Sequence, residues 1–506
     1  MRPLLVLAVL LIGLSLVALS LVALSQGTQG QELTPTPVPT PMPTPNGNVW
    51  ISLDSGSGQL AAPSGAYSYS PSLSADGNYV VFQTLANLLR DGDRNNMEDV
   101  FRRDIANATT VPVSLAVDGA FGNNRSYAPD VTADGSIVVF ESLATNLVLG
   151  DTNNAPDIYM RDLTAGATVR ITVGAGGADA NGASFRPAIS ADGAYIAFCS
   201  RATNLISGDP GGAANAFLYE RGTATFTKIP IDSNANTIGG CERVAIDDDG
   251  GTIAVAAVSD ESGRIFIYDR ASATATALTA TADGSSGLSA LAISGDGRFV
   301  AFDSAATNLV PDDSNRSRDV FVTNLGDKSV RRASVRTSGT QLPGDSGLSG
   351  VSLNRDGRFV VFGTLASDVV PGDSNGHEDV FRRDLVNSQT TIVSVNANGR
   401  PANDSSYAPD IDSDGSFVAY ASLAANIVGG DGNRQADVFV RATTFLDADG
   451  DGRPEESGAP EDNVSDAAIA RGDSNTTTLA YIGGAIGGGV LLLVAGWFLL
   501  GRRGQA

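Results

Sequence analysis

The chain has 506 residues, with 56 acidic and 33 basic side chains and a formal net charge of −23. This charge argues against nucleic acid and anionic lipid as partners, because the protein would repel both. The single histidine, His377, excludes a His-rich zinc site and gives little support to Ser-His-Asp catalysis.

The first 47 residues predict an export segment followed by a spacer. Residues 1–25 place Arg2 before an apolar run that ends in Ala-Leu-Ser, as in a signal peptide or, if it is not cleaved, a signal anchor. Residues 26–47 are rich in Pro and Thr, and prolines occupy alternate positions from Pro35 to Pro45. This pattern favours an extended, semi-rigid polyproline II spacer.

Residues 48–446 contain a sevenfold repeat. In each unit an aliphatic residue is followed three positions later by Asp-Gly, and the spacings between successive glycines are 58, 58, 57, 47, 60 and 58 residues. These periods lie just above those of propeller blades, each of which is a small sheet that cannot bury its faces alone. The seven glycines are Gly77, Gly135, Gly193, Gly250, Gly297, Gly357 and Gly415.

Each unit is predicted to form four antiparallel strands. In the second unit these are residues 127–131, 137–143, 157–161 and 168–173, which are β-branched and aromatic runs separated by turn residues. The seventh unit lacks its fourth strand, whereas residues 48–53 form a spare strand before the first unit. We therefore expect residues 48–53 to complete the seventh blade and close the ring, which leaves no open sheet edge. The fold class is an all-β, seven-bladed β-propeller.

The repeat resembles that of the TolB-type, WD40-like β-propellers. Residues 70–82, which read Ser-Pro-Ser-Leu-Ser-Ala-Asp-Gly-Asn-Tyr-Val-Val-Phe, carry the resemblance, and all seven units share it. The fourth unit departs most from this repeat, because the short segment 258–264 takes the place of the long loop. By this resemblance the chain is expected to be a non-catalytic protein- or ligand-binding scaffold.

Six units carry an Asp/Asn loop between their second and third strands. Oxygen ligands at i, i+2 and i+6 suit a hard cation such as calcium, but the same residues also build tight turns by accepting backbone N–H groups. Both interpretations stay open, and the turn is favoured, because the third unit has lost ligands, with Asp209, Gly211 and Asn215 in these places. The full pattern occurs at Asp93, Asn95 and Asp99, at Asp151, Asn153 and Asp157, at Asp313, Asn315 and Asp319, at Asp373, Asn375 and Asp379, and at Asp431, Asn433 and Asp437.

Two further acids and two cysteines are candidate functional residues. Strand alternation directs Asp130 and Asp410 toward the channel from blades on either side of the first, so that they are a candidate catalytic pair for glycan hydrolysis or simply solvated carboxylates. Cys199 and Cys241 are expected at the same end of neighbouring blades. In an exported protein they form either a disulfide or two buried thiols.

The C-terminal segments predict a tether and a membrane anchor. Residues 447–478 are acidic and begin with Asp447, Asp449 and Asp451, which resemble the start of a calcium loop that Glu455 and Glu456 would complete; the alternative is a solvated linker. Residues 479–500 form an apolar transmembrane helix, and residues 501–506 contain Arg502-Arg503 and form a cytoplasmic tail.

The sequence therefore predicts a single-pass cell-membrane protein whose propeller faces away from the cytoplasm. Its expected partner is an envelope protein or a wall glycan, with the membrane bound through the C-terminal helix and with calcium as the possible cofactor. A carbohydrate-active hydrolase that uses the channel carboxylates and a structural cell-surface protein are the alternatives to the scaffold.

Overall fold

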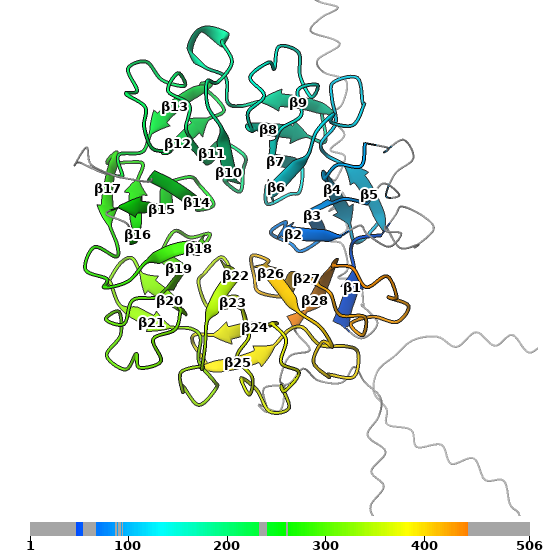
Figure 1. Ribbon diagram of the computed structural model, residues 1–506, viewed down its shortest axis with the longest axis vertical. Helices are drawn as coiled ribbons and strands as arrows, with labels where there is room; N and C mark the ends of the chain where they lie inside the picture. Colours follow the sequence, from blue (N-terminus) through cyan, green and yellow to red (C-terminus); the bar gives the residue numbers. More distant parts are fainter. Residues whose placement is uncertain are drawn as a thin grey trace, which may run out of the picture. The chain divides into compact units, whose positions relative to one another are not determined.

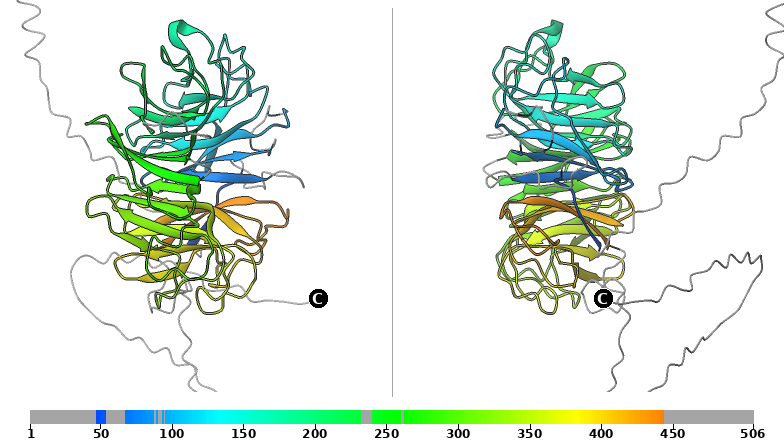
Figure 2. Two further views of the ribbon diagram at one scale, coloured as in Figure 1. Left: turned by 60° about the vertical axis from the view of Figure 1, so that its left-hand side comes forward. Right: turned by 90° about the vertical axis from the view of Figure 1, so that its right-hand side faces the viewer.

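A computed structural model shows seven four-stranded antiparallel sheets arranged around a central axis (Figure 1). The sheets stand side by side, as the two further views show (Figure 2). The structure describes residues 47–53, 67–86, 89, 93, 95–231, 240–259 and 262–443. We number the blades by the repeat units, and within each blade the strands follow one another outward from the axis.

The first four blades contain sixteen strands. Blade 1 has β2 (Ser68–Leu73), β3 (Tyr79–Thr84), β4 (Asp99–Asp104) and β5 (Thr109–Pro112), and blade 2 has β6 (Ser126–Val131), β7 (Ile137–Ser142), β8 (Asp157–Asp162) and β9 (Ala167–Arg170). Blade 3 has β10 (Ser184–Ile189), β11 (Tyr195–Ser200), β12 (Asn215–Glu220) and β13 (Thr225–Lys228), and the short 3-10 helix Ala175–Gly177 precedes it. Blade 4 has β14 (Gly240–Ile246), β15 (Thr252–Ser259), β16 (Ser262–Asp269) and β17 (Thr274–Ala277).

The last three blades complete the ring. Blade 5 has β18 (Ser286–Ile293), β19 (Phe299–Ser304), β20 (Asp319–Asn324) and β21 (Val330–Arg332), and blade 6 has β22 (Ser346–Leu353), β23 (Phe359–Thr364), β24 (Asp379–Asp384) and β25 (Gln389–Ile392). Blade 7 has β26 (Ser406–Ile411), β27 (Phe417–Ser422) and β28 (Asp437–Ala442), with β1 (Asn48–Trp50) as its outer strand. The fourth strand of blade 2 ends three residues earlier than predicted, because Val173 instead forms an isolated bridge to Asp179; Val395 of blade 6 forms the equivalent bridge to Pro401.

The N-terminal strand closes the ring as the sequence predicted. β1 pairs antiparallel with β28, and Trp50 lies opposite Phe439. Ile51 is fully buried, and the hydroxyl of Ser52 donates a hydrogen bond to Asp437 (2.6 Å). The two ends of the propeller therefore form one blade, and no strand edge is left unpaired between blades 7 and 1.

The Asp-Gly motif follows from contacts between neighbouring blades. Gly135 has φ of +71°, which favours glycine, and a Cβ at this position would collide with the ring of Tyr79 in blade 1. Within the blades, aromatic side chains of the second and third strands pair, as Phe82 does with Phe101 and Phe362 with Phe381. Apolar clusters fill the space between adjacent blades, so that the core is a ring of inter-blade layers.

A closed circle of backbone hydrogen bonds links the seven turns around the axis. Each blade donates from the turn that follows its inner strand to the corresponding turn of the next blade, and the last bond returns to blade 1. The seven bonds, each 3.0 or 3.1 Å long, run from Ala75 to Ala133, Ala133 to Ala191, Ala191 to Asp248, Asp248 to Gly295, Asp296 to Arg355, Arg355 to Ser413 and Ser413 to Ala75.

Removal of residues 1–53 should lower the melting temperature by more than about 10 °C, because the truncation strips β1 and the buried Ile51 from blade 7. Removal of residues 1–46 is the matched control and should leave the melting temperature unchanged. Thermal unfolding of the two truncated proteins measures the difference. Equal melting temperatures would contradict closure through β1.

Candidate functional site

The central channel has two different mouths. At the end where the Asp-Gly turns lie, here called the turn mouth, the circle of backbone hydrogen bonds leaves a cavity of about 150 Å³. Its charged groups are already paired in part, since Arg355 binds Asp248 at 2.7 Å. This mouth is too small for a substrate larger than a few solvent molecules.

The opposite end, here called the bulged mouth, is wider. Every inner strand has a register shift close to this end. In blades 1, 2 and 3 the shift places Ser70, Ala128 and Arg186 in the left-handed region, with φ between 50° and 52°, each directly before a proline. Bulges redirect side chains, and strained backbone of this kind is often found at functional sites. A cavity of about 550 Å³ opens here over blades 1 to 5.

Two tyrosine–glutamate pairs border this cavity. The Tyr69 hydroxyl donates to Glu98 (2.5 Å) and the Tyr127 hydroxyl donates to Glu141 (2.6 Å). The other oxygen of Glu141 accepts the backbone N–H of Arg186 at 3.2 Å. Burial raises the pKa of the Glu141 carboxyl, and it also raises the pKa of both tyrosines, to which the neighbouring carboxylates contribute.

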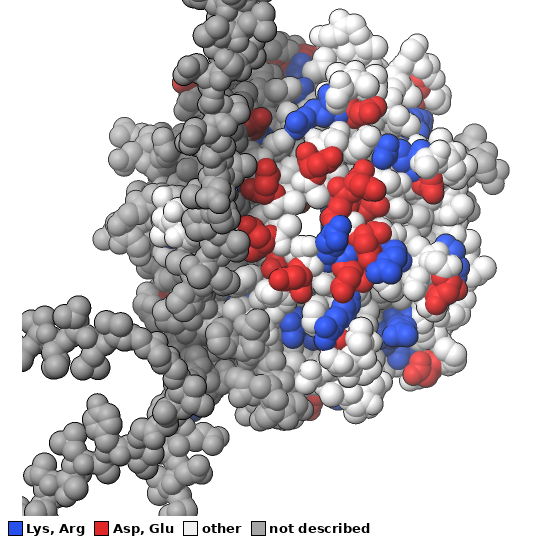
Figure 3. Space-filling model, turned by 180° about the vertical axis from the view of Figure 1, so that it is seen from behind, with Lys and Arg blue, Asp and Glu red and all other residues white. Residues whose placement is uncertain are grey.

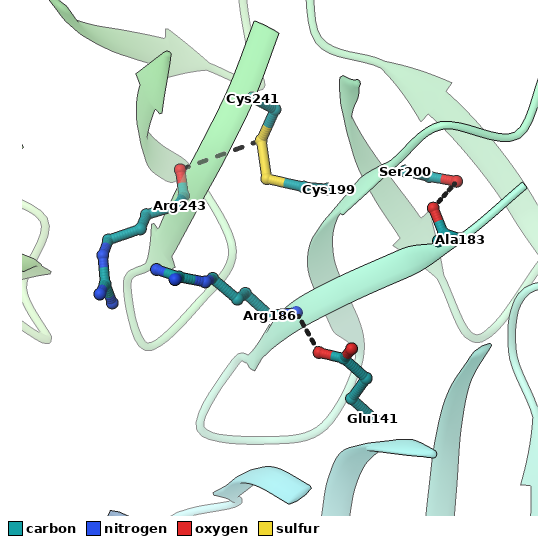
Figure 4. The surroundings of a disulfide bond; sticks show 7 residues. All are labelled: Glu141, Ala183, Arg186, Cys199, Ser200, Cys241 and Arg243. Carbon is teal, nitrogen blue, oxygen red and sulfur yellow. Dashed lines mark hydrogen bonds between the residues drawn. A yellow bond between two sulfur atoms is a disulfide. The ribbon is translucent and has the colours of Figure 1, made fainter. Parts of the chain in front are cut away.

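Three arginines line the same cavity. Arg125 and Arg186 are exposed, whereas Arg243 is half-buried and donates one hydrogen bond, to the Leu288 carbonyl (3.0 Å). The side chains of Arg186 and Arg243 extend into the same space (Figure 4). Burial, together with the nearby charge of Arg186, lowers the pKa of Arg243 to about 10. Two like charges held together in this way favour the binding of an anion between them.

A disulfide fixes the strand that carries Arg243. The structure joins Cys199 of β11 to Cys241 of β14, and both are fully buried. Figure 4 shows the disulfide beside the two arginines. The bond closes a segment of 42 residues between blades 3 and 4, which is worth about 3–4 kcal/mol by the loop-entropy estimate. It therefore holds the start of β14 against its neighbour, next to the cavity.

The predicted channel carboxylates serve as links between blades. Asp130 accepts hydrogen bonds from Ser72 of blade 1 and from the Ile189 N–H of blade 3. Asp410 accepts them from Ser352 of blade 6 and from the Leu73 N–H of blade 1. Burial raises the pKa of Asp410 to about 6, with a further contribution from Asp130. The two acids lie on either side of blade 1, as predicted, and their hydrogen bonds give both of them a structural role.

The Asp/Asn loops leave the blades at the end of the bulged mouth. In blades 1, 2, 6 and 7 the asparagine amide donates to the last aspartate of the loop, and the asparagine oxygen accepts the N–H two residues later. These contacts are those of a tight turn. The acids of the predicted calcium loop, Asp447, Asp449, Asp451, Glu455 and Glu456, lie outside the described residues.

The residues of the bulged mouth were not predicted from the sequence. A comparison of repeats looks for the residues that the units share, and it therefore overlooked five residues of this cavity, which are Tyr69, Glu98, Glu141, Arg186 and Arg243. The available signal was departure from the repeat. The position of Glu141 in blade 2 is Gln83 in blade 1, Gly363 in blade 6 and Ala421 in blade 7, which shows that this position is free to vary.

Acidic and basic side chains are both present on the face shown in Figure 3. Among the described residues visible there, no continuous basic stripe is formed. A second cavity, of about 770 Å³, is lined by the outer strand β9 of blade 2, by residues 146–150 of the same blade and by residues 116–118, which connect blades 1 and 2. Its arginine, Arg170, already forms ion pairs with Asp151 and Asp179. This cavity is therefore less suited to binding an anion than the bulged mouth is.

The sequence matches no known family profile and no curated protein. Among solved structures it is similar to an oligogalacturonate lyase from Vibrio parahaemolyticus (TM-score 0.49, 10% identity, 78% of this chain and 98% of the other). It is also similar to TolB from Acinetobacter baumannii (TM-score 0.36, 13% identity, 76% and 83%) and to a TolB homologue from Agrobacterium tumefaciens (0.34, 14%, 54% and 83%). The predicted TolB-type propeller is confirmed at the level of the fold.

These comparisons correct the predicted function. The prediction of a non-catalytic binding scaffold is withdrawn, since the solved structures of similar fold include an oligogalacturonate lyase as well as TolB. The scaffold was inferred from the fold alone, and the same fold accommodates catalytic sites. At 10–14% identity the matches show only the fold, so the activity has to be argued from the residues of the bulged mouth.

Substitution of Asp412 by Asn should stabilise the protein at neutral and alkaline pH. Burial raises the pKa of Asp412 to about 8, so the folded state keeps a proton that the unfolded chain has released above about pH 4. The stability contributed by this group is therefore lost as the pH rises through 8. Asn354 occupies the same position in blade 6 and accepts the same backbone hydrogen bond without a charge.

Denaturant unfolding of Asp412→Asn should show a gain of at least about 1 kcal/mol at pH 8.5 and none at pH 4. The exposed Asp118→Asn, between blades 1 and 2, is the control and should show no such pH-dependent gain. A loss of stability at pH 8.5 would show that Asp412 is needed in its charged form.

Proposed function

We propose that this protein is an enzyme that binds a carboxylate-bearing saccharide in the bulged mouth and cleaves it by elimination. The observation that carries the proposal is the placement of Arg186 and Arg243 side by side in a cavity with two tyrosine–glutamate pairs. Catalysis through Asp130 and Asp410 stays a prediction, and neither residue lines this cavity.

The cavity suits an acidic sugar. Its volume of about 550 Å³ lies within the range of sites for small ligands, and the rings of Tyr69 and Tyr127 provide flat, partly apolar walls. A guanidinium binds a carboxylate with two parallel hydrogen bonds. The net charge of −23 makes a dense polyanion a poor ligand, whereas an isolated uronic acid unit needs only the local positive charge of the arginines.

The same arginines favour elimination over hydrolysis. Removal of the proton next to a sugar carboxylate places negative charge on that carboxylate, where the guanidinium groups of Arg186 and Arg243 stabilise it. Glu141 borders the cavity and is the base in this proposal, because its raised pKa makes it a stronger proton acceptor than an ordinary glutamate. The proton passes to Glu141, a carbon–carbon double bond forms, and the glycosidic oxygen leaves and takes a proton from solvent.

The disulfide supports the site by positioning Arg243. Cys241 lies two residues before Arg243, and its sulfur lies 4.0 Å from the Arg243 carbonyl oxygen. An oxidised bond fits a location outside the cytoplasm, which we also propose. The signal segment (1–25), the transmembrane helix (479–500) and the tail (501–506) that underlie this location lie outside the described residues. Within the described part of the chain, no helix is long and apolar enough to span a membrane.

Glu141→Gln should lower kcat by about 10²-fold or more if Glu141 removes the proton. Gln83 takes the equivalent place in blade 1 and accepts the Ala128 N–H at 2.8 Å, so the variant keeps a contact that the fold already uses. Arg186→Ala combined with Arg243→Ala should weaken binding of an oligosaccharide that carries a single galacturonic acid unit by at least about 10-fold. The assay follows the ultraviolet absorbance of the unsaturated product.

Arg355→Ala, at the turn mouth, is the matched control for charge and should leave both values unchanged. A neutral oligogalactose of the same length should not bind. If a panel of uronic acid oligosaccharides is neither bound nor cleaved, or if Glu141→Gln keeps full activity, the proposal is wrong.

A further inference from the structure

The Asp/Asn loops of different blades neutralise their buried acids in different ways. In blade 2, Arg170 lies between Asp151 (3.1 Å) and Asp157 (3.7 Å). In blade 5, Arg332 lies between Asp313 (3.6 Å) and Asp319 (3.3 Å). In blade 3 the second acid is an asparagine, and Lys228 binds the remaining Asp209 at 3.1 Å. A side chain of the fourth strand supplies the positive charge in all three blades.

These three cations share one register position. Arg170 pairs with Tyr159, Lys228 with Phe217 and Arg332 with Phe321, in each case opposite the aromatic residue of the third strand. The same position is Ile392 in blade 6, opposite Phe381, and Trp50 in blade 7, opposite Phe439. Blades 6 and 7 therefore keep both acids of the loop but have an apolar residue where the cation stands elsewhere.

The acids of these two blades are buried and incompletely bonded. Asp373 is 2% exposed and Asp379 1% in blade 6, and Asp431 is 9% exposed and Asp437 1% in blade 7. One oxygen of Asp373 and one of Asp431 have neither a hydrogen bond nor an ion pair among the described residues. A buried carboxylate without a partner is costly, and two beside each other are more so.

The second acid of each pair is held in place by neutral donors. Asp379 accepts hydrogen bonds from Ser394 and Asn375. Asp437 accepts them from Ser52 and Asn433. These hydrogen bonds fix the positions of the carboxylates but do not neutralise their negative charge. The available ligands are oxygen atoms, which suits a hard cation, and the described residues contain no third acidic, His or Cys ligand, so carbonyls and water have to complete the shell.

We propose that blades 6 and 7 each bind a calcium ion between Asp373 and Asp379 and between Asp431 and Asp437, where arginine provides the positive charge in blades 2 and 5. Blade 1 has the same acids, Asp93 and Asp99, and Pro112 at the register position, but part of its loop lies outside the described residues. Blades 6 and 7, whose loops lie within the described residues, therefore carry the proposal. It is independent of the saccharide site.

The first experiment counts ions on the full chain. Equilibrium dialysis against calcium should show that Asp373→Asn combined with Asp431→Asn binds two ions fewer than the unaltered protein. The matched control makes the same change in the arginine-containing loops, Asp151→Asn with Asp313→Asn, and should lose none. Because the comparison is a difference, ions bound elsewhere in the chain do not affect it.

The second experiment replaces the proposed calcium ion of blade 6 by an arginine like the one in blades 2 and 5. Ile392→Arg should lose one calcium ion and make the melting temperature less dependent on calcium. In the unaltered protein, calcium at about 100 times its Kd should raise the melting temperature by roughly 5–10 °C over chelator, and magnesium should raise it less.

Two results would overturn the proposal. The first is equal calcium binding by the unaltered protein and by the Asp373→Asn, Asp431→Asn protein. The second is a melting temperature that does not respond to calcium at neutral pH but rises on acidification in chelator, since the acid pairs would then be neutralised by protons. If Ile392→Arg does not fold, the ion count on the asparagine variants still decides.

Discussion

The closed circle of seven backbone hydrogen bonds at the turn mouth is the constraint on which the rest of the structure depends. Each bond contributes only about 0.5–1.5 kcal/mol, but the seven fix the distance and tilt of all inner strands at once. The circle is complete only if every blade is present and blade 7 is closed by β1. The Asp-Gly turn recurs in all units because it places the donor and acceptor of this circle while leaving room for a side chain of the preceding blade, which is aromatic at five of the seven turns.

A ring that is fixed at one end leaves the other end free to vary. At the bulged mouth the inner strands shift register, and Gln83 and Glu141 each accept an N–H from a left-handed residue of the next blade. The repeat therefore tolerates different side chains here without loss of the fold. Glu141, Arg186 and Arg243 occupy such variable positions, which is where a repeat protein can place chemistry that only one part of the ring needs.

Much of the fold was predictable from the sequence because it depends on short-range pattern. The period of the Asp-Gly glycines gave the number of blades, and the strand-like residues 48–53 gave the closure. The ends of the fourth strands were less accurate, since Val173 and Val395 turn away to form bridges with residues further along the chain. The site was not predicted, because Arg186 and Arg243 approach each other through bulges whose geometry depends on contacts between blades.

The loops show what a register adds to a motif. The Asp-x-Asn pattern is the same in blades 2 and 6, so the motif alone does not separate a turn from an ion site. The residue that separates a turn from an ion site lies on the fourth strand, where blade 2 has Arg170 and blade 6 has Ile392. These two residues are recognised as equivalent only from the strand register, because each lies opposite the aromatic residue of the third strand. In blade 7 the hydroxyl of Ser52, which belongs to the closing N-terminal segment, bonds to Asp437. A cation bound there would hold the two ends of the propeller together, so ion binding and ring closure would stabilise each other.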